Sequence, residues 1–504
     1  MSNKLLKPGH PFHNLVLKNI YPLILLICSF GIYFTHYGTP NAMFWDENYH
    51  IASAEKHVQG VMYMEPHPPL GKMLMGLAEV VIGANDKVDK HKFTETDHIE
   101  GADTPPETKF TGYRWPSVVL MALSVLFFYG ILRRTTQNNL IAFLFSSFII
   151  FDNAMVIQAR AAMLEGIQIF FILAAIYYFV RRATSGINIS LKDYAVLGLL
   201  IGLVISVKVN GFILFLLFVM LFGIDQWRNI QALKYAELIK RLLVTVPVGV
   251  GTVALVFLSV FYVHIGMGTK VIADHTYKAS PEFLQAIRRG DTWSLSTFTI
   301  GLRDNLKYMS EYADGVPKLD ECKPDENGSY AMDWLLGKKT ISYRWDKDTV
   351  NGKVQVKYMS IVANPVIWFS VVAGIVLSLG LIMSKFIYGQ QEKNTTLFYW
   401  ICAFTTLYIS YMLAILQIER VMYLYHYLVP LVFGSINLAL MFSYIYREDI
   451  LANNKHMWIN LSVYIALVVA VFAFFAPFTY GIAMTEDQFE MRNWFSFWKL
   501  QVVQ

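Results

Sequence analysis

Charged residues and cysteines are both scarce in this sequence. Charged residues make up 16% of the 504 positions, against roughly 25% in a typical soluble domain. The three cysteines stand far apart: Cys28 and Cys402 lie in apolar segments and Cys322 in a polar stretch. This spacing indicates neither a disulfide framework nor a zinc site. The net charge of +5 is small for the length and spread over short connectors, so nucleic acid is not indicated as a partner.

Apolar residues are abundant instead, at 55% of the chain, and they gather into segments of about twenty residues. A helix needs roughly this length to cross the hydrocarbon core of a bilayer. We expect an all-α polytopic membrane protein, with one membrane domain over 1–504. The eleven expected spans lie at about 20–37, 114–132, 139–155, 163–180, 194–207, 209–225, 242–265, 363–384, 397–416, 428–446 and 458–481. The fifth and sixth are either two spans or one broken span, because only Lys208 and Asn210 interrupt the apolar run.

Lysine and arginine in the short connectors predict the orientation. With eleven spans, the connectors near 133, 182, 234, 389 and 447 fall on one side, which we expect to be cytoplasmic. The opposite side then carries two long loops, 38–112 and 266–360. Within the second loop, the pattern from Thr340 to Ile361 predicts a hairpin that turns at Asn351-Gly352. We expect this hairpin to be a lid or a packing element.

Unusual polar residues cluster in the first outer loop. Asp46 and Glu47 form an acidic pair flanked by aromatic residues, and His67 and Lys72 flank a proline-rich turn. The acidic pair alone is equally consistent with the start of a helix, where the helix dipole favours acids. A lysine at the membrane interface is likewise common without any function.

Further ionisable residues adjoin the later spans. They are Asp152, Arg160, Glu165, Lys208, Arg420 and His426. Burying such groups in a membrane costs several kcal/mol, so they usually face a polar cavity. For Glu165 the alternative is an ion pair that joins two helices. The charge rule places every cluster at the same outer face, and a site rich in cations, acids and aromatics there suits an anionic amphiphile.

On these residues the sequence resembles the protein O-mannosyltransferase family, polyprenyl-phosphate-dependent enzymes of the GT-C class. The matching motifs are Asp46-Glu47, His67-Pro68-Pro69-Leu70-Gly71-Lys72, Asp152-Asn153, Gln158-Ala159-Arg160, Ser206-Val207-Lys208, Ser280-Pro281-Glu282-Phe283, Asn364-Pro365-Val366-Ile367-Trp368 and Tyr425-His426-Tyr427-Leu428-Val429-Pro430. Two features depart from the family pattern. Glu165 stands where an Asp is usual, and 266–360 is too short for the β-trefoil module of eukaryotic members, which implies a prokaryotic-type member.

The resemblance implies an inverting transfer of a sugar, expected to be mannose, from a polyprenyl-phosphate carrier to Ser or Thr of exported proteins. It implies Asp46 as the base, with Glu47 orienting the acceptor or the neighbouring helix. Arg160 is the first choice for the donor phosphate, followed by Lys208 and Arg420. His67, Lys72, Asp152, Glu165 and His426 are assigned to substrate binding or orientation.

Protein cations meet the phosphate charge in this scheme, so no cofactor is required, although two acids are able to hold a divalent metal. The expected partners are the lipid-linked donor, the acceptor and membrane lipid, at the extracytoplasmic face of the plasma membrane. Three alternatives remain: the same donor class with a lipid acceptor, such as aminoarabinose transfer to lipid A; an oligosaccharyltransferase; and a transporter. The last predicts inverted repeats and ionisable groups near the membrane midplane, and neither is evident.

Overall fold

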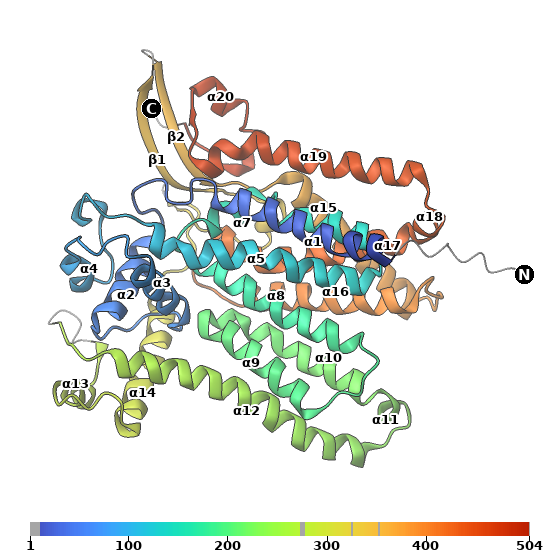
Figure 1. Cartoon of the computed structure of the whole chain (residues 1–504), viewed down its shortest axis with the longest axis horizontal. Coiled ribbons are helices and arrows are strands. Elements are labelled where there is room, and N and C mark those ends of the chain that lie inside the picture. The colour runs from blue at the N-terminus through green and yellow to red at the C-terminus, as the bar shows by residue number, and fades with distance from the viewer. Residues whose placement is uncertain (1–10, 273–277, 324–325, 351–352, 503–504) are drawn as a thin grey trace, which may run out of the picture.

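A computed structural model describes residues 11–272, 278–323, 326–350 and 353–502. Long helices run side by side through most of the molecule, with a small sheet at one end (Figure 1). The first half contains α1 (Pro11–Phe34), α2 (Glu47–Gln59), α3 (Leu70–Ile82), α4 (His91–Glu95), α5 (Thr111–Thr136), α6 (Asn139–Ser146), α7 (Asn153–Ala159), α8 (Leu164–Ala183), α9 (Leu191–Val207), α10 (Leu216–Asp225), α11 (Trp227–Gln231) and α12 (Tyr235–Met267). The second half contains α13 (Pro281–Arg288), α14 (Leu295–Gly315), β1 (Ile341–Val350), β2 (Lys353–Ile361), α15 (Pro365–Phe386), α16 (Thr395–Leu416), α17 (Leu428–Ile445), α18 (Arg447–Leu451), α19 (Lys455–Tyr480), β3 (Ala483–Met484) and α20 (Glu486–Glu490). Short 3-10 helices include η2 (Ser147–Ile149), η3 (Val209–Phe215) and η6 (Leu424–Tyr427).

All eleven expected spans fall on helical segments, but their number is not confirmed. Among the described residues, seven helices are long and apolar enough to cross a membrane: α5, α8, α12, α15, α16, α17 with η6, and α19. The third expected span is bent by 63° between α6–η2 and α7, and counting this pair gives eight. The apolar part of α1 and the segment Val209–Asp225 fall short of a full span, and α9 has only 17 residues.

The chain reverses direction at Lys208, between the fifth and sixth expected spans. The Tyr194 hydroxyl, near the start of α9, lies 3.3 Å from the carboxylate of Asp225 at the end of α10. Asp225 also accepts a 2.7 Å hydrogen bond from Arg241 near the start of α12. Residues 191–225 therefore form a helical hairpin with Lys208 at its turn, which agrees with two separate segments.

Side-chain caps begin many of the helices where a polar residue precedes an apolar run. Asp152 accepts a hydrogen bond from the backbone N–H of Met155, and Asn364 and Asn394 cap α15 and α16 in the same way. Such a cap satisfies a backbone donor that the first helical turn leaves without a partner. These residues therefore set the helix starts locally.

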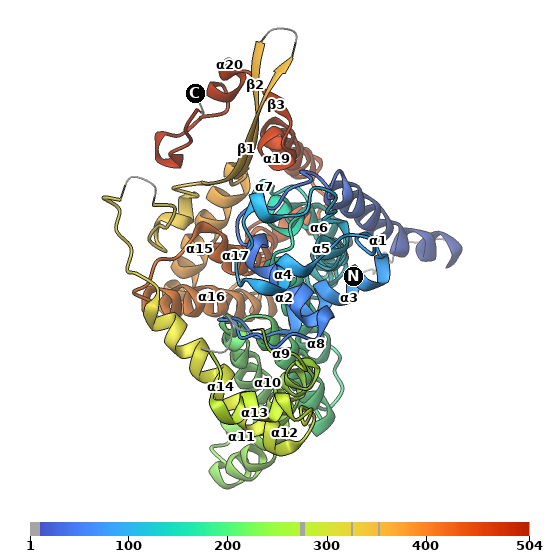
Figure 2. The ribbon, with the colours of Figure 1, turned by 90° about the vertical axis from the view of Figure 1, so that its left-hand side faces the viewer.

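Both long loops lie at the same end of the helix bundle. Figure 1 shows α2, α3, α4 and α13 at this end and α11 and α18 at the other. Seen from the loop end, α2 and α4 lie near the middle, the β1–β2 hairpin on one side and α13 and α14 on the other (Figure 2). The loops contact each other directly, since Val61 and Lys270 form a parallel β-bridge. Residues far apart in the sequence thus share one end of the molecule.

The β1–β2 hairpin occupies the expected region of the second loop and packs on α19 and α7. The predicted turn residues Asn351-Gly352 lie outside the described residues. The register shifts between Ser342 and Arg344. A bulge of this kind redirects a side chain, and the residue at the shift is Tyr343, which is buried.

Candidate functional site

Glu47 is held rigidly inside the protein. Its carboxylate forms two parallel hydrogen bonds with the guanidinium of Arg114 on α5, at 2.7 and 2.8 Å. It also accepts from the backbone N–H of Ala162 at 2.7 Å and of Phe44 at 3.2 Å. Both Glu47 and Arg114 are fully buried. These contacts join the start of α2 to α5 and to the loop before α8.

Arg114 also binds the loop that leads to the acidic pair. Its remaining donors reach the backbone carbonyls of Pro40 and Ala42, at 2.9 and 2.8 Å. Sequence reasoning missed this residue, although an arginine at the edge of an apolar span is itself an unusual feature. Arg114 therefore positions residues 40–47 as one unit.

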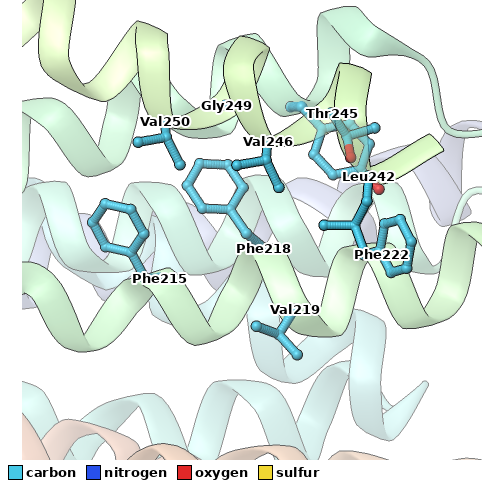
Figure 3. Close-up of a pocket in the computed structure, with 10 residues that line it drawn as sticks. Phe215, Phe218, Val219, Phe222, Leu242, Thr245, Val246, Gly249 and Val250 are labelled. Carbon is cyan, nitrogen blue, oxygen red and sulfur yellow. The ribbon is translucent and has the colours of Figure 1, made fainter. Parts of the chain in front are cut away.

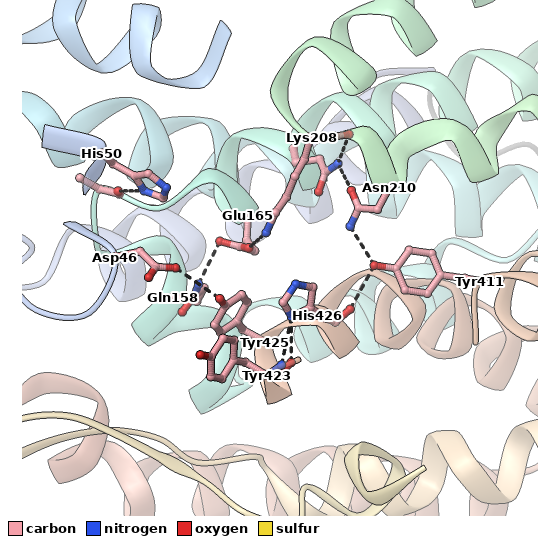
Figure 4. A network of polar contacts seen from close by, with 12 residues as sticks. Asp46, His50, Gln158, Glu165, Lys208, Asn210, Tyr411, Tyr423, Tyr425 and His426 are labelled. Atoms are coloured by element: carbon pink, nitrogen blue, oxygen red, sulfur yellow. Dashed lines mark hydrogen bonds and ion pairs between the residues drawn. The ribbon is translucent and has the colours of Figure 1, made fainter. Parts of the chain in front are cut away.

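Asp46, in contrast, leaves its carboxylate available. It occupies the cap position of α2, but its side chain makes no capping hydrogen bond. Within the described residues its carboxylate accepts one hydrogen bond, from the hydroxyl of Tyr425 at 3.3 Å (Figure 4). Burial raises the pKa of Asp46 above its usual value, and the neighbouring His50 opposes that rise. A raised pKa makes the carboxylate a stronger base.

A buried ion pair lies next to Asp46. The ammonium of Lys208 lies 2.6 Å from the carboxylate of Glu165, and Gln158 donates to the other oxygen of Glu165 at 2.9 Å. Lys208 also lies 5.3 Å from the centre of the Tyr425 ring. Figure 4 draws Asp46, Glu165, Lys208 and Tyr425 close together. The helix-joining ion pair considered for Glu165 is therefore present, and it also holds a lysine beside Asp46.

Aromatic residues from distant segments pack around Asp46. Trp45 packs against Tyr343 of β1 and Tyr423, with ring centres 5.3 Å apart in both cases. The Tyr343 hydroxyl donates to Gln158, which links the hairpin to the ion pair. Tyr343 is a second residue that sequence reasoning missed, because only the bulge in β1 turns it inward. The hairpin is thus packed into the site.

His67 and Lys72 lie close to this cluster. Lys72 is fully buried and forms an ion pair with Glu65. His67 has a buried Nδ1 atom with no hydrogen-bond partner among the described residues. Burial lowers the pKa of His67 well below its usual value, and the nearby Lys208 and Lys72 lower it further. His67 is therefore neutral and able to donate or accept one hydrogen bond.

Arg420 lies at the border of the cluster. It is partly exposed, and its charge is one of those that lower the pKa of His67. Its backbone pairs with Lys318 of the second loop, while the neighbouring Glu419 forms an ion pair with the Lys318 side chain. In the described parts of the chain no acid pairs with Arg420, so its guanidinium is available to an anion.

The structure does not bring Arg160 and Asp152 into the cluster. The Arg160 guanidinium donates to the backbone carbonyls of Thr35, His36 and Thr479 and lies 4.6 Å from the Tyr480 ring centre. Its guanidinium thus links the end of α1 to α19, and its role as a phosphate ligand stays a prediction. Asp152 caps α7 and accepts from the Trp368 indole at 2.8 Å, which is a structural role.

His426 does belong to the cluster, stacked on Tyr425 with ring centres 4.7 Å apart. Its Nδ1 lies 3.0 Å from the Tyr423 carbonyl, so it supports the two tyrosines.

Across the described ranges, no three His, Cys, Asp or Glu side chains gather closely enough to hold a metal ion.

Comparison with known proteins shows similarity over most of the chain. The profile described as dolichyl-phosphate-mannose-protein mannosyltransferase matches residues 23–267. The profile described as the C-terminal four TMM region of protein-O-mannosyltransferase matches residues 307–498.

Curated relatives match over a part of their length. Protein O-mannosyl-transferase 2 of Drosophila melanogaster is 24% identical, over 48% of this chain and 32% of that protein. Dolichyl-phosphate-mannose–protein mannosyltransferase 1 of Schizosaccharomyces pombe is 26% identical, over 54% of this chain and 30% of that protein. The matched regions thus span about a third of these relatives.

A solved structure shares the fold. A chain of the S. cerevisiae protein O-mannosyltransferase Pmt1–Pmt2 complex bound to the sugar donor superposes with a TM-score of 0.79 and 15% identity, covering 96% of this chain and 93% of that chain. This likeness shows a common fold, and the GT-C-like helical fold expected from the sequence is confirmed.

Proposed function

The chain belongs to the protein O-mannosyltransferase family, and from this premise we propose that it transfers mannose from a polyprenyl-phosphate carrier to a hydroxyl of an acceptor protein. The observation that carries the proposal is the setting of Asp46. Its carboxylate takes part in neither a helix cap nor an ion pair among the described residues, and it lies beside Lys208, Tyr425 and His50. A catalytic base must be free to approach the proton of the acceptor hydroxyl, and the Asp46 carboxylate is free in this sense while lying near a cation that could hold an anionic donor.

Asp46 is the base in this proposal. It removes the proton from the acceptor hydroxyl as the oxygen attacks the anomeric carbon of mannose. The bond between that carbon and the phosphate oxygen breaks, and polyprenyl phosphate leaves with the bonding electrons. A single displacement from the opposite face inverts the anomeric configuration.

Arg420 and Lys208 are the proposed phosphate ligands. Arg420 has an unpaired guanidinium within the described residues, and a guanidinium binds phosphate through two parallel hydrogen bonds. Lys208 uses one of its three donors on Glu165, so two remain. His67 is the proposed partner of a sugar hydroxyl or a phosphate oxygen, because its buried Nδ1 has no partner among the described residues.

We place this site at the extracytoplasmic face of the plasma membrane, as the lysine and arginine pattern predicts. Native Cys322 offers a test, since it is exposed in the second loop. A membrane-impermeant maleimide is expected to label Cys322 in intact cells. A Cys322→Ser, Lys393→Cys variant, altered in an exposed connector, is expected to react only after permeabilisation. The reverse pattern refutes the orientation.

Asp46→Asn tests the base. Purified protein is assayed with synthetic polyprenyl-phosphate mannose and a peptide rich in Ser and Thr. Loss of the base is expected to lower turnover by about two to four orders of magnitude. Thermal stability is expected to stay unchanged, because the Asp46 carboxylate caps no helix. Asp86→Asn, an exposed acid on the same loop, is the matched control. Near-native turnover in Asp46→Asn refutes the proposed base.

The same assay identifies the acceptor. Transfer to the peptide supports a protein acceptor. Transfer only to lipid A or to another glycolipid refutes the proposed acceptor while leaving the donor chemistry in place.

A further inference from the structure

The turn between α13 and α14, residues 288–295, exposes large apolar side chains. Trp293 is 49% exposed and Leu295 is 75% exposed. The two helices that flank the turn occupy one side of the loop end (Figure 2). The Trp293 ring packs on Tyr262 near the end of α12, so the α13–α14 turn forms a surface apart from the cluster around Asp46.

The length of α12 sets the depth of this turn in a bilayer. No charged residue lies between Arg241 and Tyr262, and this stretch is about 32 Å long at 1.5 Å per residue. The hydrocarbon core of a bilayer is about 30 Å thick. Figure 3 shows the apolar character of the stretch, where Val246 and Val250 face Phe218 of α10. With Arg241 at one boundary of the core, Tyr262 therefore lies at the other boundary.

Trp293 covers α12 at this second boundary. Its ring centre lies 5.6 Å from that of Tyr262, and the Tyr262 hydroxyl donates to the Trp293 carbonyl at 2.6 Å. Gly266 permits the contact, because a Cβ atom there would lie 2.5 Å from the Trp293 ring. Leu255 and Leu258 are exposed, and they share a face of the helix with Tyr262 because they precede it by seven and four residues. Trp293 therefore continues the face of α12 that a membrane would cover.

Two cations stand at the start of the turn. Arg288 ends α13 and Arg289 follows it, and both side chains are exposed. Among the described residues neither arginine forms an ion pair with an acid, whereas Arg303 of α14 pairs with Glu282. The acid within the turn is Asp291. The α13–α14 turn thus carries a net positive charge at the boundary of the membrane.

We propose that the α13–α14 turn is an interfacial anchor that binds anionic phospholipid head groups. Its two exposed apolar side chains lie among the upper parts of the acyl chains, and its two arginines lie against the phosphates. Indole rings favour this depth, and a guanidinium binds a phosphate through two parallel hydrogen bonds. A soluble anion would leave the apolar side chains in water. A bilayer covers them, because the turn continues the exposed face of α12 at its boundary.

The anchor takes no part in the transfer reaction itself. It fixes the start of α14 at the membrane surface. The other end of α14 leads to Lys318, whose backbone pairs with that of Arg420. The anchor therefore holds the second outer loop in place beside the site.

The depth of the turn is measured with the fluorescent dye NBD on single cysteines, in a full chain whose three native cysteines are replaced by alanine. Leu295→Cys carries the dye on the turn, and Glu95→Cys carries it at an exposed position on α4. The protein is reconstituted in phosphatidylcholine vesicles that contain a lipid with a nitroxide high on its acyl chain. The nitroxide is expected to quench the dye at position 295 about threefold more strongly than at position 95. Equal quenching overturns the anchor. A blue-shifted emission at position 295 without quenching assigns the surface to a protein partner and overturns the lipid.

Head-group selection is measured with nitroxide-labelled phosphatidylglycerol and nitroxide-labelled phosphatidylcholine, which differ only in the head group. In the Leu295→Cys protein, phosphatidylglycerol is expected to quench about two- to fivefold more strongly. Adding Arg288→Gln and Arg289→Gln is expected to remove this preference and to leave quenching by phosphatidylcholine unchanged. Adding Arg303→Gln and Lys307→Gln removes two exposed cations of α14 that pair with acids, and the preference is expected to remain. An absent preference, or its loss in both double variants, overturns the selection of anionic head groups by the turn.

Discussion

Changing Glu47 to Gln is expected to destabilise the protein strongly, although the change replaces a single atom. All four contacts of the Glu47 carboxylate come from donors: two N–H groups of Arg114 and the backbone N–H groups of Phe44 and Ala162. A glutamine offers one accepting oxygen, and its NH2 group would face donors. The substitution therefore leaves Arg114 buried with an uncompensated charge.

The magnitude follows from this burial. Both side chains are fully buried, and breaking a buried ion pair by removing one charge costs about 3–5 kcal/mol. The carbonyls of Pro40 and Ala42 stay bonded to Arg114 and offset a part of the cost, so we expect about 3 kcal/mol. The Asp46 carboxylate accepts one hydrogen bond among the described residues, so we expect Glu47→Gln to lower stability more than Asp46→Asn does.

Unfolding of purified protein in detergent, followed by tryptophan fluorescence, measures this effect. Glu107→Gln, an exposed acid on the same loop, serves as the control and is expected to change the free energy of unfolding by less than about 0.5 kcal/mol. The double variant Glu47→Gln, Arg114→Gln is expected to lose less stability than the two single variants added together, because the partners are coupled. A loss below about 1 kcal/mol in Glu47→Gln would refute the reasoning.

Three further predictions concern charge. Arg420→Gln is expected to raise the KM for the lipid-linked donor by about 10- to 100-fold, because a charge-assisted phosphate contact is lost. Arg303→Gln removes an exposed arginine on α14 and is expected to leave the KM unchanged. Equal effects of the two changes would exclude Arg420 from the site. Burial alone would raise the pKa of Asp97, but Lys56 and Lys278 lower it to about 2. The contribution of ionised Asp97 to folding stability is therefore complete above about pH 4 and declines as the pH falls toward 2. An Asp97→Asn variant, with the free energy of unfolding measured at each pH, should lack this decline. Chelation with EDTA is expected to leave transfer intact because Arg420 and Lys208 meet the phosphate charge, and a loss that Mg²⁺ or Mn²⁺ restores would contradict this.

The general class of the protein could be read from local sequence. Apolar runs of membrane-spanning length and lysines and arginines between them predict a polytopic membrane protein, and every expected span falls on helix. The number of spans did not follow as directly. The bend before Asp152 and the short α9 and α10 depend on how the helices pack against their neighbours, which hydropathy does not report.

The candidate site was predictable in part. Asp46, Lys208 and Glu165 attract attention because ionisable groups beside apolar runs are costly. Arg160 attracts attention for the same reason, but its donors serve three backbone carbonyls. The cost of burying a charge indicates that the charged side chain has a partner, but not which partner it has. A backbone carbonyl 319 positions away accepts from the Arg160 guanidinium, as the phosphate of a bound donor would.

Helix starts, apolar segments and the few charges beside them follow from local sequence, because caps, periodicity and hydropathy act over a few neighbouring residues. The role of each charge depends on tertiary packing. Asp46 and Glu47 are adjacent in the chain, yet the packing of α5 gives Glu47 a buried arginine and leaves the Asp46 carboxylate in the cluster with Tyr425. The bulge in β1 likewise turns Tyr343 toward Gln158. The Glu47–Arg114 contact joins residues that are 67 positions apart in the chain, and the Tyr343–Gln158 contact joins residues that are 185 positions apart. Local preferences carry no information about contacts at that range.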